Sequence, residues 1–495
     1  MKRKDFLLLA LLTGATFFVH GYHPAVEDAA VYNPSILKSL HPQLYPFGSE
    51  FFELQSRLTL YPQLIAYSVR LTHLSLDTTL FAWQILTSFL LLFAAKWLIS
   101  QCFESSTARW AGVCLIASLF TLSVAGTALY IKDEYLTPRA FALIAALLMI
   151  VAALRKKYWP IVPLAIVSAV IHPMMFIYGL SFIAVLAWVR WRAASLKTPS
   201  HLSRAAITAV LLPFGFTFKY PSQTYIQVIH IRRYFFLAEW HWYEWLGLLG
   251  PIAILWGFAR LARRRNQPTL ELICIAAVIY QSVWFLISVL MTVPPRLIIL
   301  AHYQPLRSLQ LTYVLMFLIG GAFLGEYVLR RRVWLWLVFF APLCFGMFYA
   351  QRQLFPASQH IEWPGRAPTN EWLKAFSWIR DNTPTDAIFA LNPDHMHLPG
   401  EDEQGFRAVA QRSTLADAVK DSAPAAIIPE FPLAEEWKQQ TDALASWTNF
   451  QAADFARLHR DWKVTWVVID QASFREIPAL DCLYANHTVL VCKTP

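Results

Sequence analysis

The chain reads His23-Pro24-Ala25-Val26-Glu27-Asp28-Ala29-Ala30-Val31-Tyr32 directly after its first apolar run, residues 6–19. Two adjacent carboxylates, Glu27 and Asp28, therefore stand at the start of a polar loop in a chain that is otherwise mostly apolar. Such a pair can act as a general base or hold a divalent cation. We predict that the rest of the chain is a frame that places this loop on the outer face of a membrane.

The composition is that of a helical membrane protein. Of the 495 residues, 57% are hydrophobic and 15% are charged, whereas soluble domains carry about 25% charged residues. The formal net charge of +10 does not indicate nucleic-acid binding, because the basic residues cluster at the ends of apolar runs, which is a signal of membrane topology. These clusters are Arg155-Lys156-Lys157, Arg190 with Arg192, Arg263-Arg264-Arg265 and Arg330-Arg331-Arg332.

Apolar length and the placement of Lys and Arg predict about eleven spans, with the N-terminus inside and the C-terminus outside. The first run is interpreted as an uncleaved span, because no small-x-small cleavage site precedes His23. Pro173 breaks one long run into two legs with His172 at the outer turn. The predicted spans are 5–20, 78–100, 110–130, 138–154, 159–171, 173–189, 203–218, 243–261, 269–293, 308–329 and 333–350.

Two further regions complete the predicted architecture, which is a mainly α, polytopic helical membrane bundle followed by a small soluble α/β domain. Within the membrane part, 1–350, an outer loop at 21–77 contains amphipathic helices over 50–73 that lie at the interface. Residues 351–495 are long enough for a core of their own. Alternating helical and strand patterns predict an extracytoplasmic α/β domain there, with helices at 369–381, 433–448 and 450–460 and strands at 386–390 and 464–469.

The end of the chain, 480–493, predicts a hairpin that turns near Asn486. Cys482 and Cys492 then lie on facing strands, where an oxidising compartment allows a disulfide. Two unpaired thiols are the alternative, because facing strands do not guarantee the geometry that a disulfide needs.

Several polar groups share the outer side in this topology, and ionisable groups near membrane depth indicate a functional site. Taken singly, most have a plain structural explanation: solvated loop residues, surface ion pairs, a helix end, or arginines that reach lipid headgroups. Only Asp28 and Arg139 stand out individually. Taken together, the set favours a site that comprises Glu27, Asp28, His23, Asp133, Glu134, Arg139, His172, Arg296 and Arg307.

The order of these features resembles the GT-C superfamily of membrane glycosyltransferases: one span, a long outer loop with an early acidic residue, many spans, and an outer α/β domain. More narrowly, four motifs resemble a group of uncharacterised bacterial multispanning membrane proteins. They are His23-Pro24-x-x-Glu27-Asp28, Tyr135-Leu136-Thr137-Pro138-Arg139, His172-Pro173-Met174-Met175 and Gln304-Pro305-Leu306-Arg307. The Trp-Trp-Asp type signature of oligosaccharyltransferases is absent from the sequence.

The broad resemblance implies an inverting transfer of a sugar from a polyprenyl-phosphate donor to an extracytoplasmic acceptor, at the outer face of the bacterial inner membrane. By analogy, Asp28 or Glu27 is the base that activates the acceptor hydroxyl. Arg307, Arg139 or Arg296 neutralises the leaving lipid phosphate, and His172 orients the donor or the base. A divalent cation as cofactor stays open.

Two alternatives from other classes remain. A transporter or flippase of a lipid-linked or polar solute would use the same charges to line a path, and it predicts charges deep in the spans and related halves. A non-catalytic scaffold would use its outer domain to bind envelope partners. The enzyme predicts that Asp28→Asn abolishes function in folded protein, whereas the scaffold predicts that this change is tolerated.

Overall fold

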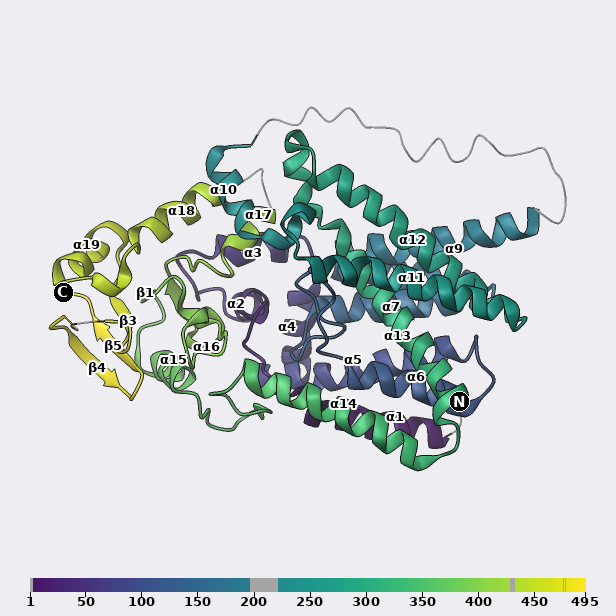
Figure 1. Cartoon of the computed structure of the whole chain (residues 1–495). Coiled ribbons are helices and arrows are strands. Elements are labelled where there is room, and N and C mark those ends of the chain that lie inside the picture. Colours follow the sequence, from purple (N-terminus) through teal and green to yellow (C-terminus); the bar gives the residue numbers. More distant parts are fainter. Residues whose placement is uncertain (1–2, 196–220, 428–431, 475, 477) are drawn as a thin grey trace.

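The structure is a computed structural model that describes residues 3–195, 221–427, 432–474, 476 and 478–495. The predicted span at 203–218 lies outside these residues. Helices near the N-terminus and through the middle of the chain form a bundle, and the C-terminal part forms a separate α/β region beside it (Figure 1). The chain starts at the end of the bundle that is remote from this region, and it ends in the region's sheet.

The bundle confirms a multi-pass membrane protein. The described residues contain six helices long and apolar enough to cross a membrane, and two shorter apolar helices. The six are α5 (Leu76–Ile99), α9 (Pro173–Ser195), α11 (Trp242–Arg264), α12 (Pro268–Thr292), the run Pro295–Leu329 that contains α13 (Leu309–Leu324), and α14 (Val333–Leu354). The shorter two are α7 (Pro138–Leu154) and α8 (Ile161–Ile171).

The first predicted span corresponds to α1 (Arg3–His20), which has Arg3, Lys4 and Asp5 in its first turn and packs on α5 and α14. The break at His172 is confirmed, because α8 ends there and α9 starts at Pro173. The total of about eleven spans and the orientation of the termini stay predictions.

The predicted span over 110–130 is wrong in its extent. The helix there, α6 (Ser106–Ser118), ends early, and residues 119–137 form an irregular loop. Ser123 pairs with Tyr130 in a short bridge, and Ala125 and Ala128 adopt left-handed backbone conformations with φ of 42° and 52°. The turn is apolar in composition but tight in geometry, so hydropathy alone cannot distinguish it from a helix. This loop is one wall of the site described below.

Three helices of the predicted outer loop lie between the bundle and the α/β region: α2 (Ala29–Leu40), α3 (Glu50–Arg57) and α4 (Tyr61–Thr72) (Figure 1). The helices predicted over 50–73 are thus confirmed as α3 and α4. A fourth junction helix, α10 (Gln223–Ile231), packs against α17 (Ser422–Ile427) of the α/β region. The polar loop that follows α1 is therefore enclosed by both parts of the chain.

The α/β region contains a mixed five-stranded sheet with the order β2-β1-β3-β5-β4. The strands are β1 (Ile388–Leu391), β2 (Ser413–Thr414), β3 (Trp466–Asp470), β4 (Asp481–Ala485) and β5 (Val489–Lys493). The strands β2, β1 and β3 are parallel, whereas β5 and β4 are antiparallel additions. The predicted strands at 386–390 and 464–469 are confirmed as β1 and β3 within a few residues.

The sheet is covered on both faces, because its central strands alternate between two cores. Phe389 and Val468 face a core that includes Trp372 and Phe376 of α15 (Glu371–Asn382). Ala390, Val467 and Ile469 face the opposite core, which includes Phe455 of α19 (Ala452–Trp462). The predicted helices at 369–381, 433–448 and 450–460 appear as α15, α18 (Leu433–Ala443) and α19.

The C-terminal hairpin has the predicted turn, since β4 and β5 flank Asn486. Cys482 and Cys492 are register partners on these strands and form a disulfide. The structure therefore contains the disulfide and not the two free thiols. The bridge joins an edge strand to a strand in contact with the centre of the sheet.

The bundle and the α/β region meet through a close backbone contact at Gly405, directly before α16 (Phe406–Ala410). A methyl group at this position would lie 2.5 Å from Cβ of Ala30 in α2. In addition, Val26 forms an antiparallel bridge with Gln404, and the Gly405 N–H donates to the Ala25 carbonyl at 2.9 Å. Glycine therefore permits the approach that seats residues 25–28 on the α/β region.

Gly405→Ala is expected to lower the free energy of unfolding by about 1–3 kcal/mol, because the new methyl group overpacks this contact. The measurement is the thermal unfolding midpoint of the purified protein in lipid nanodiscs. Gly346→Ala in α14 is the matched control, since nothing lies within 4 Å of its added methyl group. Equal midpoints for the two variants would contradict the expectation.

Candidate functional site

A cavity of about 320 Å³ contains four of the residues predicted from the sequence. We call it the carboxylate cavity. Its walls are the loop before α2, the irregular loop 119–137, the start of α7 and the segment 233–244. Its lining includes Glu27, Asp28, Asp133 and Arg139 from the predicted set, and also Tyr130, Tyr135, Arg233, Tyr234 and Glu244.

Asp28 is the carboxylate most clearly presented to this cavity, with about a third of its side chain exposed. It directly precedes α2, where a helix N-terminus favours negative charge. Its Oδ2 accepts a bond from Arg139 at 2.6 Å, and its Oδ1 lies 3.7 Å from Nζ of Lys420. Burial favours the neutral acid, but Arg139 and Lys420 hold the pKa of Asp28 well below its usual range. Asp28 is therefore an anion at neutral pH.

Arg139 joins the two acidic positions that the sequence places far apart. Its guanidinium is buried, with 2% of the side chain exposed, and it also donates to Oδ1 of Asp133 at 2.9 Å. Asp133 is fixed in turn by the Thr137 hydroxyl, 2.8 Å from its Oδ2. A buried charge is stable only when paired, so the Asp28–Arg139–Asp133 triad is a rigid part of the site.

Glu27 makes the contact between the bundle and the α/β region. Its carboxylate accepts a bond from Lys420 at 2.5 Å, and its backbone N–H donates to the Glu403 carbonyl at 3.1 Å. The residue adopts a left-handed conformation with φ of 54°, which is uncommon outside glycine. Burial alone would raise the pKa of Glu27, but Lys420 and a hydrogen bond with Glu403 lower it. Glu27 therefore balances Lys420.

Lys420 is held in place by a buried network in the α/β region. Its backbone N–H donates to Oδ1 of Asp417 at 2.5 Å, which closes a tight turn. Arg407 donates to both carboxylate oxygens of Asp421 at 2.8 and 2.7 Å, a bidentate pair in the same turn. These contacts fix the turn that directs the ammonium group of Lys420 at Glu27 and Asp28.

Arg307 is a half-buried cation of the predicted set, and it forms no ion pair with the described residues. It lies on a short turn (Pro305–Ser308), and its Nε is buried without a hydrogen-bond partner within the described part of the chain. Its charge acts on both Asp28 and His172. Two small cavities of about 10 and 20 Å³ are lined by Arg307, and the first shares Tyr234 with the carboxylate cavity. A buried donor of this kind is suited to an anionic ligand.

His172 is buried at the outer turn between α8 and α9, near Arg307 and Arg139. Burial, Arg307 and Arg139 together lower its pKa to about 3. Its Nδ1 accepts the Met175 N–H at 3.4 Å. His172 is therefore neutral. It contributes a hydrogen bond to the start of α9 and no charge to the site.

Besides Arg307 and His172, three further predicted residues do not line the carboxylate cavity. His23 is fully buried and faces Glu362, with Nδ1 at 2.8 Å from the carboxylate. The Glu134 side chain is buried away from the cavity lining, and burial raises its pKa to about 8. Arg296 is exposed on a short helical segment (Pro295–Tyr303). The sequence places all three on the outer side, but only tertiary packing decides which side chains converge.

The acidic residues do not fit a divalent cation. No group of three or more His, Cys, Asp or Glu side chains suited to a metal occurs within the described ranges. Asp28 and Asp133 already share Arg139, while Glu27 and Asp28 face Lys420. A divalent cation needs free carboxylate oxygens, and here positively charged side chains occupy them.

The Glu27–Glu403 pair predicts a pH-dependent stability. Burial and the charge of Glu27 raise the pKa of Glu403 to about 8. Between about pH 4.5 and pH 8 the folded chain therefore holds a proton that the unfolded chain has lost, so the free energy of unfolding falls as pH rises through this window. The lowered pKa of Glu27 acts in the opposite direction, below about pH 4.5.

Denaturation midpoints measured between about pH 5 and pH 9 test this expectation. The slope should be weaker in Glu403→Gln, which keeps the neutral form at every pH, by the share of this one carboxyl. The share of Glu134, whose pKa is also raised to about 8, should remain. Asp481→Asn, an exposed position on β4, serves as the control. A Glu403→Gln variant with the wild-type slope would contradict the assignment.

Three residues of the site were not predicted from the sequence: Lys420, Glu403 and Arg233. Arg233 lines the cavity and donates to Glu244 at 3.2 Å. The signal available for Lys420 was the dense spacing of Asp417, Lys420 and Asp421 in an outer domain with few such clusters. That spacing marks a structured turn but does not say what the turn faces.

A family model described as "Domain of unknown function (DUF6798)" matches residues 370–427, which contain Glu403, Arg407 and Lys420. No curated protein sequence matches the chain.

Among solved structures, the apo oligosaccharyltransferase of Archaeoglobus fulgidus is similar at 12% identity with a TM-score of 0.46, over 95% of this chain and 70% of that one. The structure of its complex with Zn and sulfate is similar at 12% identity with a TM-score of 0.44, over 94% of this chain and 68% of that one. A third structure is that of the archaeal oligosaccharyltransferase AglB from the same organism in complex with an inhibitory peptide and a dolichol-phosphate. It is similar at 12% identity with a TM-score of 0.40, over 94% of this chain and 69% of that one.

Proposed function

We propose that the chain is a membrane glycosyltransferase that moves a sugar from a polyprenyl-phosphate donor to an acceptor on the outer face of the bacterial inner membrane. One observation carries the proposal. An ionised carboxylate, Asp28, and a half-buried arginine, Arg307, act on each other electrostatically, beside a cavity whose walls are the loops of the helical bundle. The Nε of Arg307 has no hydrogen-bond partner among the described residues. This combination provides a group that accepts a proton and a group that accepts a phosphate.

The proposed reaction uses these two groups at opposite ends of the transferred sugar. The acceptor hydroxyl bonds to Asp28 and attacks the anomeric carbon, while the bond from that carbon to the lipid phosphate oxygen breaks. The phosphate leaves with the electron pair, and its growing negative charge is stabilised by Arg307, and by Arg233 from the cavity wall. The hydroxyl proton passes to Asp28 as the new glycosidic bond forms.

Arg139 and Lys420 have a positioning role in this scheme. They fix the carboxylate of Asp28 and keep it ionised, so that an oriented acceptor for the hydroxyl proton exists before substrate binds. A strongly lowered pKa makes Asp28 a weak base. This suits a reaction in which the proton is lost late, after the bond to the leaving phosphate has weakened.

The membrane supplies the donor in this proposal. The run Pro295–Leu329 contains Arg307 and is one of the six helical segments apolar enough to cross a membrane. An apolar polyprenyl chain can remain among such helices while its phosphate reaches Arg307. Membrane lipids and an extracytoplasmic acceptor are the expected partners.

The test is donor turnover by the full-length protein in lipid nanodiscs, with a panel of polyprenyl-phosphate sugars. Arg307→Gln is expected to reduce turnover by about 10²–10³-fold, the range found when one donor to a developing charge is removed. Arg296→Gln is the matched control, because Arg296 is an exposed arginine that does not line the cavity. Chelation of divalent cations should leave turnover unchanged.

Three outcomes would count against the proposal. No turnover with any donor, in protein shown to be folded, would favour the transporter or the scaffold. Equal turnover by Arg307→Gln and Arg296→Gln would remove Arg307 from the site. Loss of activity on chelation would show that the carboxylates release their cationic side chains to a metal.

A further inference from the structure

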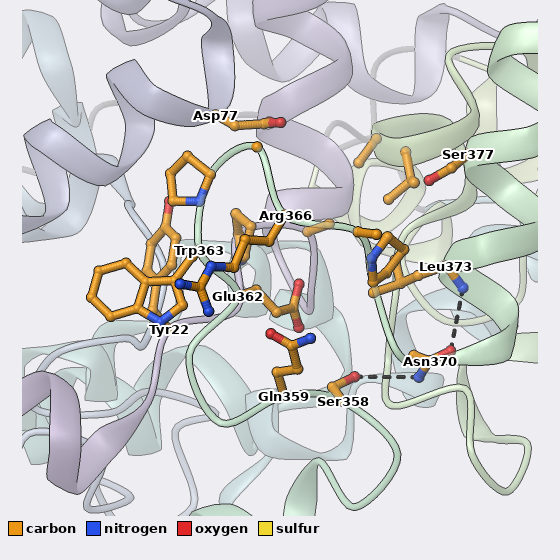
Figure 2. A pocket seen from close by; sticks show the side chains of 18 of the residues that line it. Tyr22, Asp77, Ser358, Gln359, Glu362, Trp363, Arg366, Asn370, Leu373 and Ser377 are labelled. Atoms are coloured by element: carbon orange, nitrogen blue, oxygen red, sulfur yellow. Dashed lines mark hydrogen bonds between the residues drawn. The ribbon is translucent and has the colours of Figure 1, made fainter.

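A second and larger cavity, of about 530 Å³, lies where the bundle meets the α/β region (Figure 2). We call it the junction cavity. Its walls come from the loop after α1, the start of α5, the segment 358–370, α15 and the end of α16. It shares no lining residue with the carboxylate cavity. The two cavities are lined by different parts of one segment, with Tyr22, Ala25 and Asn33 in one and Glu27 and Asp28 in the other.

One buried polar group in the lining is left without a partner. Tyr22 is 1% exposed, and its hydroxyl has no hydrogen-bond partner among the described residues. Burial raises the pKa of this phenol well above its usual value, and so do the negative charges of Asp77 and Glu362. The hydroxyl is therefore protonated, and it is a hydrogen-bond donor on which the charges of two carboxylates act. A buried polar group without a partner costs stability and needs an explanation, such as a ligand.

The lining of the junction cavity also contains two carboxylates and an aromatic surface. Asp77 comes from the start of α5, whereas Glu362 and Trp363 come from the segment 358–370 (Figure 2). Glu362 is held by His23 at 2.8 Å. The Trp363 ring contacts Phe81 edge-on, with centroids 5.4 Å apart, and stays 41% exposed. The cavity thus offers an aromatic surface held by Phe81 next to a carboxylate held by His23.

The charges of the lining limit the class of ligand. Asp77 and Glu362 are matched by Arg366 and Arg380 from the same lining, so neither an anion nor a cation is strongly favoured. A sugar presents hydroxyls that both donate and accept, and an apolar C–H face that packs on the negative face of an aromatic ring. The volume is within the range of small-molecule sites, about 300–1,000 Å³.

We propose that the junction cavity is a binding site for a neutral oligosaccharide, which lies against Trp363 and hydrogen-bonds to Tyr22, Asp77 and Glu362. Binding there does not depend on the transfer reaction proposed above. Binding in this cavity would nevertheless affect the carboxylate cavity, since the segment that lines the junction cavity continues into Glu27 and Asp28. A bound sugar chain would be held beside the loop that bears these carboxylates.

The experiment measures binding of chitotetraose and mannotetraose to the full-length protein in lipid nanodiscs by saturation-transfer NMR and titration calorimetry. A hyaluronan tetrasaccharide provides an acidic sugar of the same length, and an uncharged Gly-Ser peptide provides a different class of ligand. We expect at least one neutral tetrasaccharide to bind, and Trp363→Ala and Asp77→Asn each to weaken that binding about tenfold or more, as for central contacts of an interface.

Matched variants separate this site from a general loss of structure. Trp159→Ala removes an exposed tryptophan far along the chain, and Asp481→Asn removes an exposed carboxylate of the sheet; both should bind as wild type. Asp28→Asn should keep the affinity even where turnover is lost, so the two proposals can fail separately. Absence of binding by both neutral sugars, tighter binding of the acidic sugar or the peptide, or unchanged affinity in Trp363→Ala would overturn the proposal.

Discussion

Asp28→Asn is expected to lower donor turnover by about 10³-fold, within the range that general base catalysis contributes. The amide keeps the size of the side chain but removes the negative charge that receives the hydroxyl proton. Arg139 retains Asp133 as a partner at 2.9 Å, so its buried charge stays paired and the fold is preserved. The measurement is turnover of the polyprenyl-phosphate sugar that the wild type uses, in protein with an unchanged unfolding midpoint.

Two further variants make this result specific. Asp461→Asn removes an exposed aspartate that, like Asp28, pairs with an arginine, and it should leave turnover unchanged. Glu27→Gln should change turnover by less than about tenfold, because Glu27 is directed at Lys420 and not held beside Arg139. Turnover that survives in Asp28→Asn but is lost in Glu27→Gln would assign the base to Glu27 instead.

Lys420→Ala is expected to lower the free energy of unfolding by about 3 kcal/mol, the lower end of the effect of breaking a buried pair. The Lys420 side chain is 9% exposed, and its loss leaves Glu27, Asp28 and Glu403 close together with less positive charge among them. Glu27 is 28% exposed, so water relieves part of the repulsion. Chemical denaturation in nanodiscs, monitored by tryptophan fluorescence, measures the change.

The control for Lys420 is Lys438→Ala, which breaks the exposed Lys438–Asp442 pair in the same region and should cost less than about 1 kcal/mol. In the Lys420→Ala background, Glu27→Gln should restore part of the stability, because it removes the charge left without a partner. Equal losses for the two lysine variants, or no recovery in the double variant, would show that the pair does not hold the bundle and the α/β region together.

The local features of this protein could be predicted from its sequence. Apolar runs without charge indicate membrane helices, and α5, α9, α11, α12 and α14 match such runs closely. Consecutive apolar residues, such as Phe389 with Ala390 and Val467 with Val468, indicate a strand that is covered on both faces. Each of these patterns depends on residues a few positions apart, so no long-range information is needed.

Asp28 and Arg139 could also be chosen from the sequence, because charges beside apolar runs are costly and must find partners. That they pair with each other, across 111 positions, is a result of the packing of α7 against the loop before α2. The early end of α6 likewise depends on tertiary contacts, since the loop 119–137 is apolar enough to read as a continued helix.

The sequence by itself thus determined the membrane helices, the α/β domain and the acidic loop after the first helix, because these features are encoded over short distances. Only the tertiary structure decided that Lys420 meets Glu27 across 393 positions. No periodic pattern encodes such a contact. It depends on how the turn 417–421 is closed by Asp417 and on the space left by Gly405, which together seat the α/β region on the acidic loop.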